Sequence, residues 1–184
     1  MIIVEGPDGS GKDTLIAQLM SDFGTLVVRG PRAVKSSHAG PVDNLGKWVA
    51  EDLRQWPWSE ATRIYNRHPL ISEPIYGPLL RGHVDPGFQM SWDLAWNYFT
   101  SNTLVIFCLP PLSVVMNNVS QARDMPGVAE NIEKIWESYR AGAKEYPGWA
   151  MKYDYTEEGP IPYRKVQMAA MVHINEREKN RADD

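Results

Sequence analysis

A short apolar stretch that runs directly into a glycine-rich turn constrains the fold of this chain more than any other feature. Residues 1–4 read Met-Ile-Ile-Val, residues 6–13 read Gly-Pro-Asp-Gly-Ser-Gly-Lys-Asp, and residues 14–20 are periodically apolar. Strand, glycine-rich turn and helix, in this order, form the context of a phosphate-binding P-loop. Glycines allow backbone N–H groups to turn inward, and the helix N-terminus adds partial positive charge. The stretch therefore predicts a nucleoside triphosphate site.

The predicted loop supplies a defined set of phosphate ligands. Lys12 is expected to reach the β- and γ-phosphates as a mobile positive charge, while the remaining residues offer backbone N–H groups and hydroxyls. We therefore expect ATP as the cofactor. The cofactor-binding residues are expected to be Gly6, Gly9, Ser10, Gly11, Lys12, Asp13 and Thr14.

One position of the loop departs from the usual pattern. The residue after the lysine is ordinarily Ser or Thr, whose hydroxyl binds Mg²⁺, but here it is Asp13, followed by Thr14. A carboxylate is a good ligand for a hard cation, so Asp13 is a candidate Mg²⁺ ligand, directly or through a water. The alternative is that Asp13 only complements the helix dipole. The sequence leaves both interpretations open.

Length and composition favour one globular domain, residues 1–184. A net charge of −4 argues against broad electrostatic binding of nucleic acid, although it leaves a local basic groove open. The single Cys108 lies in an apolar run and is expected to be buried in a reducing compartment. No apolar run approaches the ~20 residues of a membrane span, and no signal peptide is visible. We expect a cytoplasmic protein without a membrane partner.

Apolar runs alternate with helical patterns along the chain. This alternation predicts an α/β P-loop NTPase three-layer fold, with a parallel sheet of about five strands and helices on both faces. Ligands of such sheets bind at the carboxyl ends of the strands, so residues 66–68 should share one rim with the P-loop. Beyond residues 1–4, strands are expected at 25–29, 62–66, 103–109 and 151–155. Beyond the P-loop helix, helices are expected at 45–56, 73–81, 92–99, 110–119, 128–146 and 163–176.

Three segments together resemble a known family. Residues 5–12, Glu-Gly-Pro-Asp-Gly-Ser-Gly-Lys, are similar to the P-loop of the thymidylate kinases, a branch close to the deoxynucleoside kinases. Arg67 and His68 resemble the family's Asp-Arg-(Tyr/His/Phe) element. The strand at 104–111 is followed by a helix and by Arg123, where the family has its lid, here at about 117–128. The overall character resembles that of phage-encoded members.

The resemblance implies roles for individual residues. Asp8 would bind the 3′-hydroxyl of a deoxynucleotide, and Arg67 would contact the acceptor phosphate or the transferring phosphoryl group. Lys12 would neutralise charge at that group, and Arg123 would close over it. Phosphoryl transfer needs chiefly such positioning and positive charge. ATP and Mg²⁺ would be the cofactors, and because many relatives are dimers, a homodimer is left open.

Two departures from the family pattern lead to a hypothesis about the metal. The family's Asp before the arginine is Asn66 in this chain, and its Ser or Thr after the lysine is Asp13. We hypothesise that Asp13 has taken over part of the metal binding and that Asn66 no longer contributes to it.

Four other residues are candidates for substrate contacts. Trp92 and Trp96 lie four apart on one helix and could stack on a nucleobase, but core packing is the favoured interpretation. Glu73 is either a first-turn charge, which is favoured, or a carboxylate of the site. Arg32 could reach a substrate phosphate, although a solvated charge is the simpler interpretation.

Three functions are compatible with these features. The leading one is an ATP-dependent deoxynucleoside monophosphate kinase, thymidylate-like, whose acceptor phosphate needs no general base. The alternative is a kinase of a hydroxyl acceptor, such as a deoxynucleoside or a 5-hydroxymethyl-pyrimidine in phage DNA, with Asp8 or Glu73 as base. The third is a nucleotide-binding module that binds ATP without transferring its phosphate.

Overall fold

The five strands of the described residues form one parallel sheet. The computed structural model describes residues 1–29, 45–55, 61–85, 92–119 and 126–182. The sheet order is β2-β3-β1-β4-β5, and each neighbouring pair is parallel. The α/β fold class predicted from the alternation of elements is therefore confirmed. The strands are β1 (Ile2–Glu5), β2 (Val27–Arg29), β3 (Arg63–Asn66), β4 (Leu104–Cys108) and β5 (Trp149–Tyr153).

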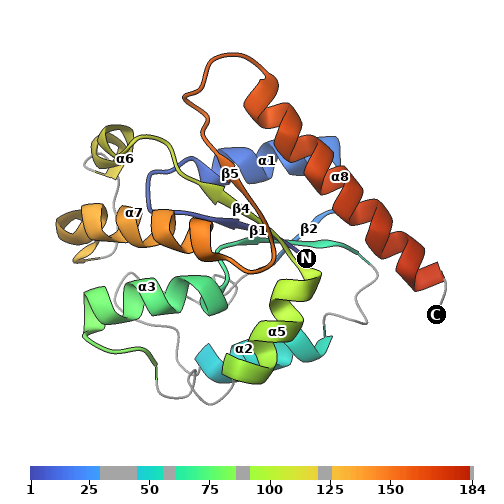
Figure 1. Cartoon of the computed structure of the whole chain (residues 1–184), viewed down its shortest axis with the longest axis horizontal. Helices are drawn as coiled ribbons and strands as arrows, with labels where there is room; N and C mark the ends of the chain where they lie inside the picture. The colour runs from blue at the N-terminus through green and yellow to red at the C-terminus, as the bar shows by residue number, and fades with distance from the viewer. Residues whose placement is uncertain (30–44, 56–60, 86–91, 120–125, 183–184) are drawn as a thin grey trace.

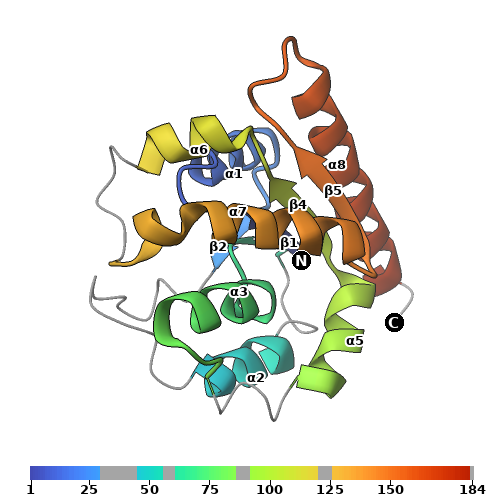
Figure 2. The ribbon, with the colours of Figure 1, turned by 60° about the vertical axis from the view of Figure 1, so that its left-hand side comes forward.

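Helices cover both faces of this sheet. One core cluster packs α1 and α8 against one face, and a second packs α2, α3, α5, α6 and α7 against the other. Figure 1 shows α1 and α8 together on one side, and Figure 2 shows α7, α3 and α2 stacked one below another. The helices are α1 (Lys12–Asp22), α2 (Leu45–Gln55), α3 (Pro69–Arg81), α5 (Trp92–Asn102), α6 (Leu112–Val119), α7 (Val128–Glu145) and α8 (Ile161–Ala182).

Strand β1 occupies the centre of the sheet and carries the P-loop at its carboxyl end. It pairs with β3 on one side and with β4 on the other, and all four of its residues are buried. A strand covered on both faces is expected to read as a continuous apolar run, which is how residues 1–4 read. The fold therefore places the glycine-rich turn in the middle of the rim where strand ends converge.

The expected element boundaries are close for most of the chain, but α3 was misplaced. The sequence predicts a helix over 73–81, whereas α3 begins four residues earlier, at Pro69. Proline suits the first turn of a helix, because its missing N–H has no intrahelical partner there. His68 caps this turn by accepting the N–H of Leu70, a signal that is not evident in the sequence.

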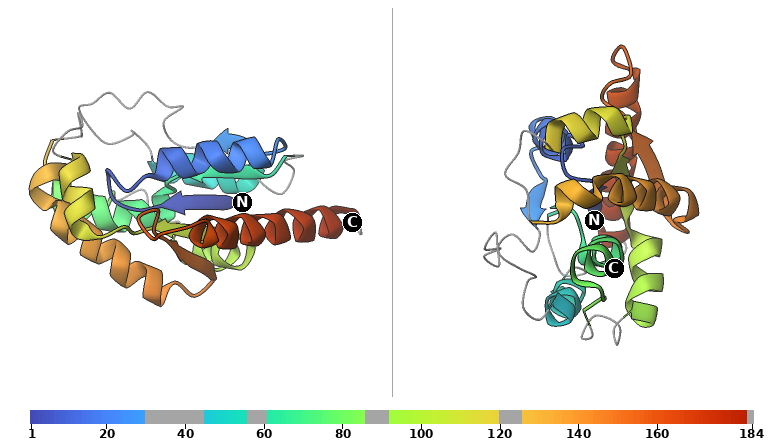
Figure 3. Two further views of the ribbon diagram at one scale, coloured as in Figure 1. Left: turned by 90° about the horizontal axis from the view of Figure 1, so that it is seen from above. Right: turned by 90° about the vertical axis from the view of Figure 1, so that its left-hand side faces the viewer.

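Helix α8 was expected over 163–176 but extends over Ile161–Ala182. Figure 3 shows it running alongside the sheet. Its buried residues Val166, Ala170 and Ile174 pack on the core, and Arg177 donates a hydrogen bond to the carbonyl of Ala61 at 3.1 Å. This last contact lies beyond the predicted helix end. Within the described residues, no helix is both long enough and apolar enough to span a membrane.

Candidate active site

Glycines form the P-loop because its backbone adopts conformations that other residues rarely tolerate. Gly6, Gly9 and Gly11 all have positive φ, at 142°, 73° and 83°. A Cβ at Gly6 would lie 2.4 Å from the carbonyl oxygen of Cys108, at the end of β4. The loop therefore needs glycine both for conformation and for close approach. This geometry is the one that the sequence predicted for a phosphate cradle.

The N-terminus of α1 presents donors towards this cradle. Gly11 is the N-cap residue and provides no side-chain cap, so the first N–H groups of α1 receive no side-chain hydrogen bond from it. Lys12 is buried, and its ammonium donates to the carbonyl of Pro7 at 2.6 Å. Burial, followed by the nearby charge of Arg67, lowers the pKa of Lys12 to about 8. An anion bound here would offset both effects, so the loop fits the phosphates of ATP.

Arg67 reaches the P-loop from the end of β3, as its place on the shared rim predicted. Its Nε donates to the carbonyl of Gly6 at 3.2 Å, and its Nη2 lies 2.9 Å from Oδ1 of Asp8. The residue has a φ of 65°, in the left-handed region that side chains seldom adopt. The two residues expected to contact acceptor phosphate and sugar are thus direct neighbours.

Tyr76 of α3 completes this cluster, and sequence reasoning missed it. Its hydroxyl accepts from Nη2 of Arg67 at 2.7 Å and donates to Oδ2 of Asp8 at 2.8 Å. Burial alone would raise the pKa of Asp8, but the charges of Arg67 and Lys12 outweigh burial and lower this pKa to about 2. Asp8 is therefore a firmly ionised carboxylate. No local pattern marks Tyr76, since it comes from the middle of α3, ten residues beyond the end of β3.

Glu5 is a buried carboxylate directly before the loop. Its Oε1 accepts the backbone N–H of His68 at 2.6 Å, and its Oε2 accepts the hydroxyl of Tyr139, from α7, at 2.9 Å. Burial raises its pKa to about 7, against the opposing effect of these donors and of nearby cations. Glu5 thus joins the central strand to the turn after β3 and to α7.

The two residues that depart from the family pattern contact each other. Nδ2 of Asn66 donates to Oδ1 of Asp13 at 2.5 Å. Asp13 is exposed in the first turn of α1, next to Lys12. A carboxylate and an amide of this kind offer oxygen ligands that suit Mg²⁺, which usually keeps several waters and substrate phosphates in its coordination shell. No group of three or more His, Cys, Asp or Glu in the described segments could hold a metal ion.

Two residues that sequence reasoning also missed, Asn118 and Tyr155, contact the P-loop. Nδ2 of Asn118, near the end of α6, donates to the carbonyl of Gly9 at 2.7 Å and to the hydroxyl of Tyr155 at 3.0 Å. The ring of Tyr155 lies 2.9 Å from the position that a Cβ of Gly11 would occupy. These contacts tie the segment after β5 to the loop.

The remaining predicted residues lie elsewhere or outside the described part. Glu73 is not the first-turn charge that was the favoured interpretation, because α3 begins four residues earlier; it is buried in an ion pair with Arg81 and accepts the N–H of Asp85 at 3.0 Å. Trp96 packs against the core, with its ring centroid 6.0 Å from that of Phe99, in agreement with the favoured core interpretation.

Among the remaining candidates, Thr14 lies exposed on α1, after Asp13. Arg32, Arg123 and the side chain of Trp92, at the start of α5, lie outside the described part of the chain.

Comparisons with known proteins identify distant relatives of the chain in sequence and in structure. The chain matches no protein-family model. It is 23% identical over 188 residues to a guanylate kinase of Rickettsia typhi, covering 98% of this chain and 93% of the relative. A guanylate kinase of Rickettsia prowazekii is also 23% identical, over 192 residues, with the same coverage.

Solved structures show the same fold. The YorR protein of Bacillus subtilis, in complex with phosphorylated GDP, has a TM-score of 0.64 and 16% identity, covering 93% of this chain and 95% of that one. A deoxyadenosine kinase of M. mycoides with bound dATP has a TM-score of 0.61 and 16% identity, covering 92% and 97%. The fold is that of the P-loop kinases. With its intact phosphate cradle and its curated relatives, the chain is a P-loop phosphotransferase.

Proposed function

We propose that the protein is an ATP-dependent kinase of a deoxynucleoside monophosphate. The observation that carries this proposal is the cluster of Asp8, Arg67 and Tyr76 beside the P-loop lysine. A nucleotide bound there would exchange the contact between Asp8 and Arg67 for its own groups, its phosphate pairing with Arg67 and its sugar hydroxyl with Asp8. The guanylate kinases among the relatives support a nucleoside monophosphate as acceptor.

The state of the carboxylates favours a phosphate acceptor over a hydroxyl acceptor. A hydroxyl acceptor benefits from a general base whose pKa lies near the working pH. Asp8 has a pKa of about 2, and both of its oxygens are engaged by Arg67 and Tyr76. Glu73 is engaged by Arg81. Glu5 has a pKa of about 7, but it is fully buried and both of its oxygens accept hydrogen bonds, from His68 and from Tyr139. A phosphate acceptor, largely dianionic at neutral pH, needs no base, so it suits this site better.

The positive charges have complementary tasks in the proposed reaction. Lys12 would move from the carbonyl of Pro7 to the β- and γ-phosphates of ATP, while the N–H groups of the P-loop and of α1 hold these phosphates. Arg67 would face the acceptor side. When bound, Mg²⁺ would supply further positive charge at the phosphates. Arg123, as a lid residue, stays a prediction.

Asp13 is proposed as the residue of the chain that binds the metal, in contact with Asn66. Their hydrogen bond supports the idea that one carboxylate has been exchanged between these two neighbouring positions. Asp13→Ala should weaken the binding of Mn²⁺ in the presence of a non-hydrolysable ATP analogue, measured by electron paramagnetic resonance. The variant Asp13→Thr with Asn66→Asp should restore it. Unchanged Mn²⁺ binding in Asp13→Ala would refute the assignment.

A radiolabel transfer screen with Mg²⁺-ATP tests the function. The acceptors are the deoxynucleoside monophosphates, with thymidylate and guanylate as the first pair, the nucleosides, and DNA with normal or hydroxymethylated pyrimidines. We expect label on a free monophosphate and a loss of transfer in Lys12→Ala. Label only on hydroxymethylated DNA, with a steep fall in rate as salt rises, would replace the proposal with the hydroxyl kinase. ATP that stays intact with every acceptor would indicate a binding module. A homodimer and a cytoplasmic location stay predictions.

A further inference from the structure

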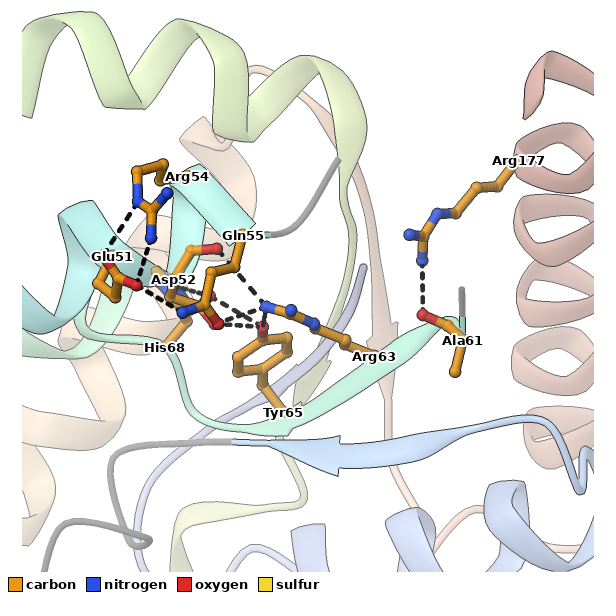
Figure 4. Close-up of polar contacts among 9 residues, drawn as sticks. All are labelled: Glu51, Asp52, Arg54, Gln55, Ala61, Arg63, Tyr65, His68 and Arg177. Carbon is orange, nitrogen blue, oxygen red and sulfur yellow. Dashed lines mark hydrogen bonds and ion pairs between the residues drawn. The ribbon is translucent and has the colours of Figure 1, made fainter. Parts of the chain in front are cut away.

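A buried polar cluster lies behind Arg67, between α2 and β3. Oδ1 of Asp52 accepts from Nη1 of Arg63 at 2.9 Å and from the hydroxyl of Tyr65 at 2.9 Å. His68 stands on the other side of the carboxylate, with Nε2 3.7 Å from Oδ2 of Asp52. All four residues are at most 9% exposed. Figure 4 shows them converging, with Glu51 and Arg54 forming a separate pair nearby on α2.

The surroundings of His68 set its orientation and its tautomer. Nδ1 accepts the N–H of Leu70 at 3.2 Å, so this nitrogen carries no proton, and in the neutral ring the proton is on Nε2. That Nε2–H faces Asp52 and makes no hydrogen bond within the described residues, although it is fully buried. The rings of Trp48 and Phe99 flank the imidazole, at centroid distances of 5.6 and 4.7 Å. A buried N–H in this position needs the carboxylate, because it has no access to water.

His68 is directly coupled to the backbone of Arg67. The N–H of Arg67 donates to the carbonyl of Val4 at 2.9 Å, and the N–H of His68 donates to Glu5 at 2.6 Å. Between these two bonds the chain passes through the left-handed φ of 65° at Arg67, a conformation that persists only where neighbouring contacts impose it. The imidazole, which accepts the N–H of Leu70 and faces the Asp52 carboxylate at 3.7 Å, is the side chain that follows this turn.

We propose that Asp52 and His68 are positioning residues that hold Arg67 in its left-handed turn, so that its guanidinium points at the acceptor phosphate. This inference rests on the proposed function. Neither residue touches the substrate. The Asp52 carboxylate, 3.7 Å from Nε2, orients the ring by its charge, the ring holds the turn, and the turn places the arginine. A purely structural role, in which the cluster only fastens α2 to the sheet, is the alternative.

A double-mutant cycle with Arg67 separates the two roles. Asp52→Asn and His68→Asn are each made alone and with Arg67→Ala, and single-turnover transfer, KM and thermal unfolding are measured. Asn at position 68 still caps α3, because its side-chain oxygen can accept the N–H of Leu70. A misplaced charge at a reacting group is costly, so we expect each single variant to lower kcat about tenfold with the KM for ATP nearly unchanged. In the Arg67→Ala background neither should lower kcat further.

Glu51→Gln is the matched control, since this carboxylate neighbours Asp52 on α2 but pairs with exposed Arg54. It should leave kcat unchanged. The inference would be overturned if each variant lowered kcat by the same factor with and without Arg67. It would also be overturned if the decrease in kcat were fully explained by a smaller fraction of folded protein. If Asp52→Asn does not fold, His68→Asn decides the outcome by the same cycle. If Arg67→Ala itself leaves transfer unchanged, the proposed function fails instead, and the two failures are therefore distinguishable.

Discussion

Replacing Glu5 by Gln should change how folding stability depends on pH. The pKa of Glu5 is raised from 4.5 to about 7 in the folded protein. A carboxyl whose pKa is higher in the folded protein binds its proton more tightly in the native state. Its contribution to the free energy of unfolding is therefore full below pH 4.5 and is lost as pH rises through 7. With 1.36 kcal/mol per pKa unit, the loss is ~3 kcal/mol. Gln cannot titrate, so its variant should lack this decline.

The free energy of unfolding from urea titrations at pH 5 and pH 8 measures this effect for both proteins. All other titrating groups are shared, so the difference between wild type and Glu5→Gln isolates Glu5. We expect the variant to gain ~2.5 kcal/mol relative to wild type between the two pH values, because part of the loss already occurs below pH 5, with unchanged m-values. Tyr139→Phe removes one donor to the carboxylate and should keep the decline. A difference between wild type and Glu5→Gln that is equal at both pH values would refute the reasoning.

Three further predictions concern the loop, the core and a structural ion pair. Gly6→Ala should destabilise the fold by ~1–3 kcal/mol and weaken ATP binding in calorimetry, because its Cβ would meet the backbone of Cys108; native-like affinity would contradict this. Leu15→Ala, fully buried, should cost ~2–5 kcal/mol in urea unfolding, whereas the exposed Met20→Ala on the same helix should change stability little. Glu73→Gln should lower the melting temperature but leave kcat intact, and a large kcat loss would restore Glu73 as a candidate base.

The local parts of the site could be predicted from the sequence. The P-loop is a continuous segment whose glycines, lysine and flanking strand and helix are all visible in sequence order. The alternation of strands and helices then sufficed to bring Arg67 to the same rim, because parallel strands share their carboxyl ends. Topology predicted only this shared rim, and the ion pair between Arg67 and Asp8 is an observation of the structure.

The parts contributed by distant helices could not be predicted. Tyr76, Tyr139 and Asn118 each reach the loop or its neighbours from a helix whose rotation is fixed by core packing. Their spacing in the sequence is the same as that of ordinary core or surface residues. Asp52 is similar, since a single carboxylate on an amphipathic helix gives no sign that it will be buried against β3. Such residues are recognised only when the packed arrangement is known.

If the proposed function holds, the missing side-chain cap of α1 links the folding of the protein to the supply of its nucleotide. Gly11 leaves the first N–H groups of α1 for a phosphate, so an anion would complete the helix end that the chain itself leaves open. A ligand at 100 times its Kd adds ~2.7 kcal/mol to the stability of the state that binds it. In a cell, bound ATP would therefore stabilise the folded protein continuously. When the ATP concentration falls, the fraction of unfolded protein open to degradation would rise.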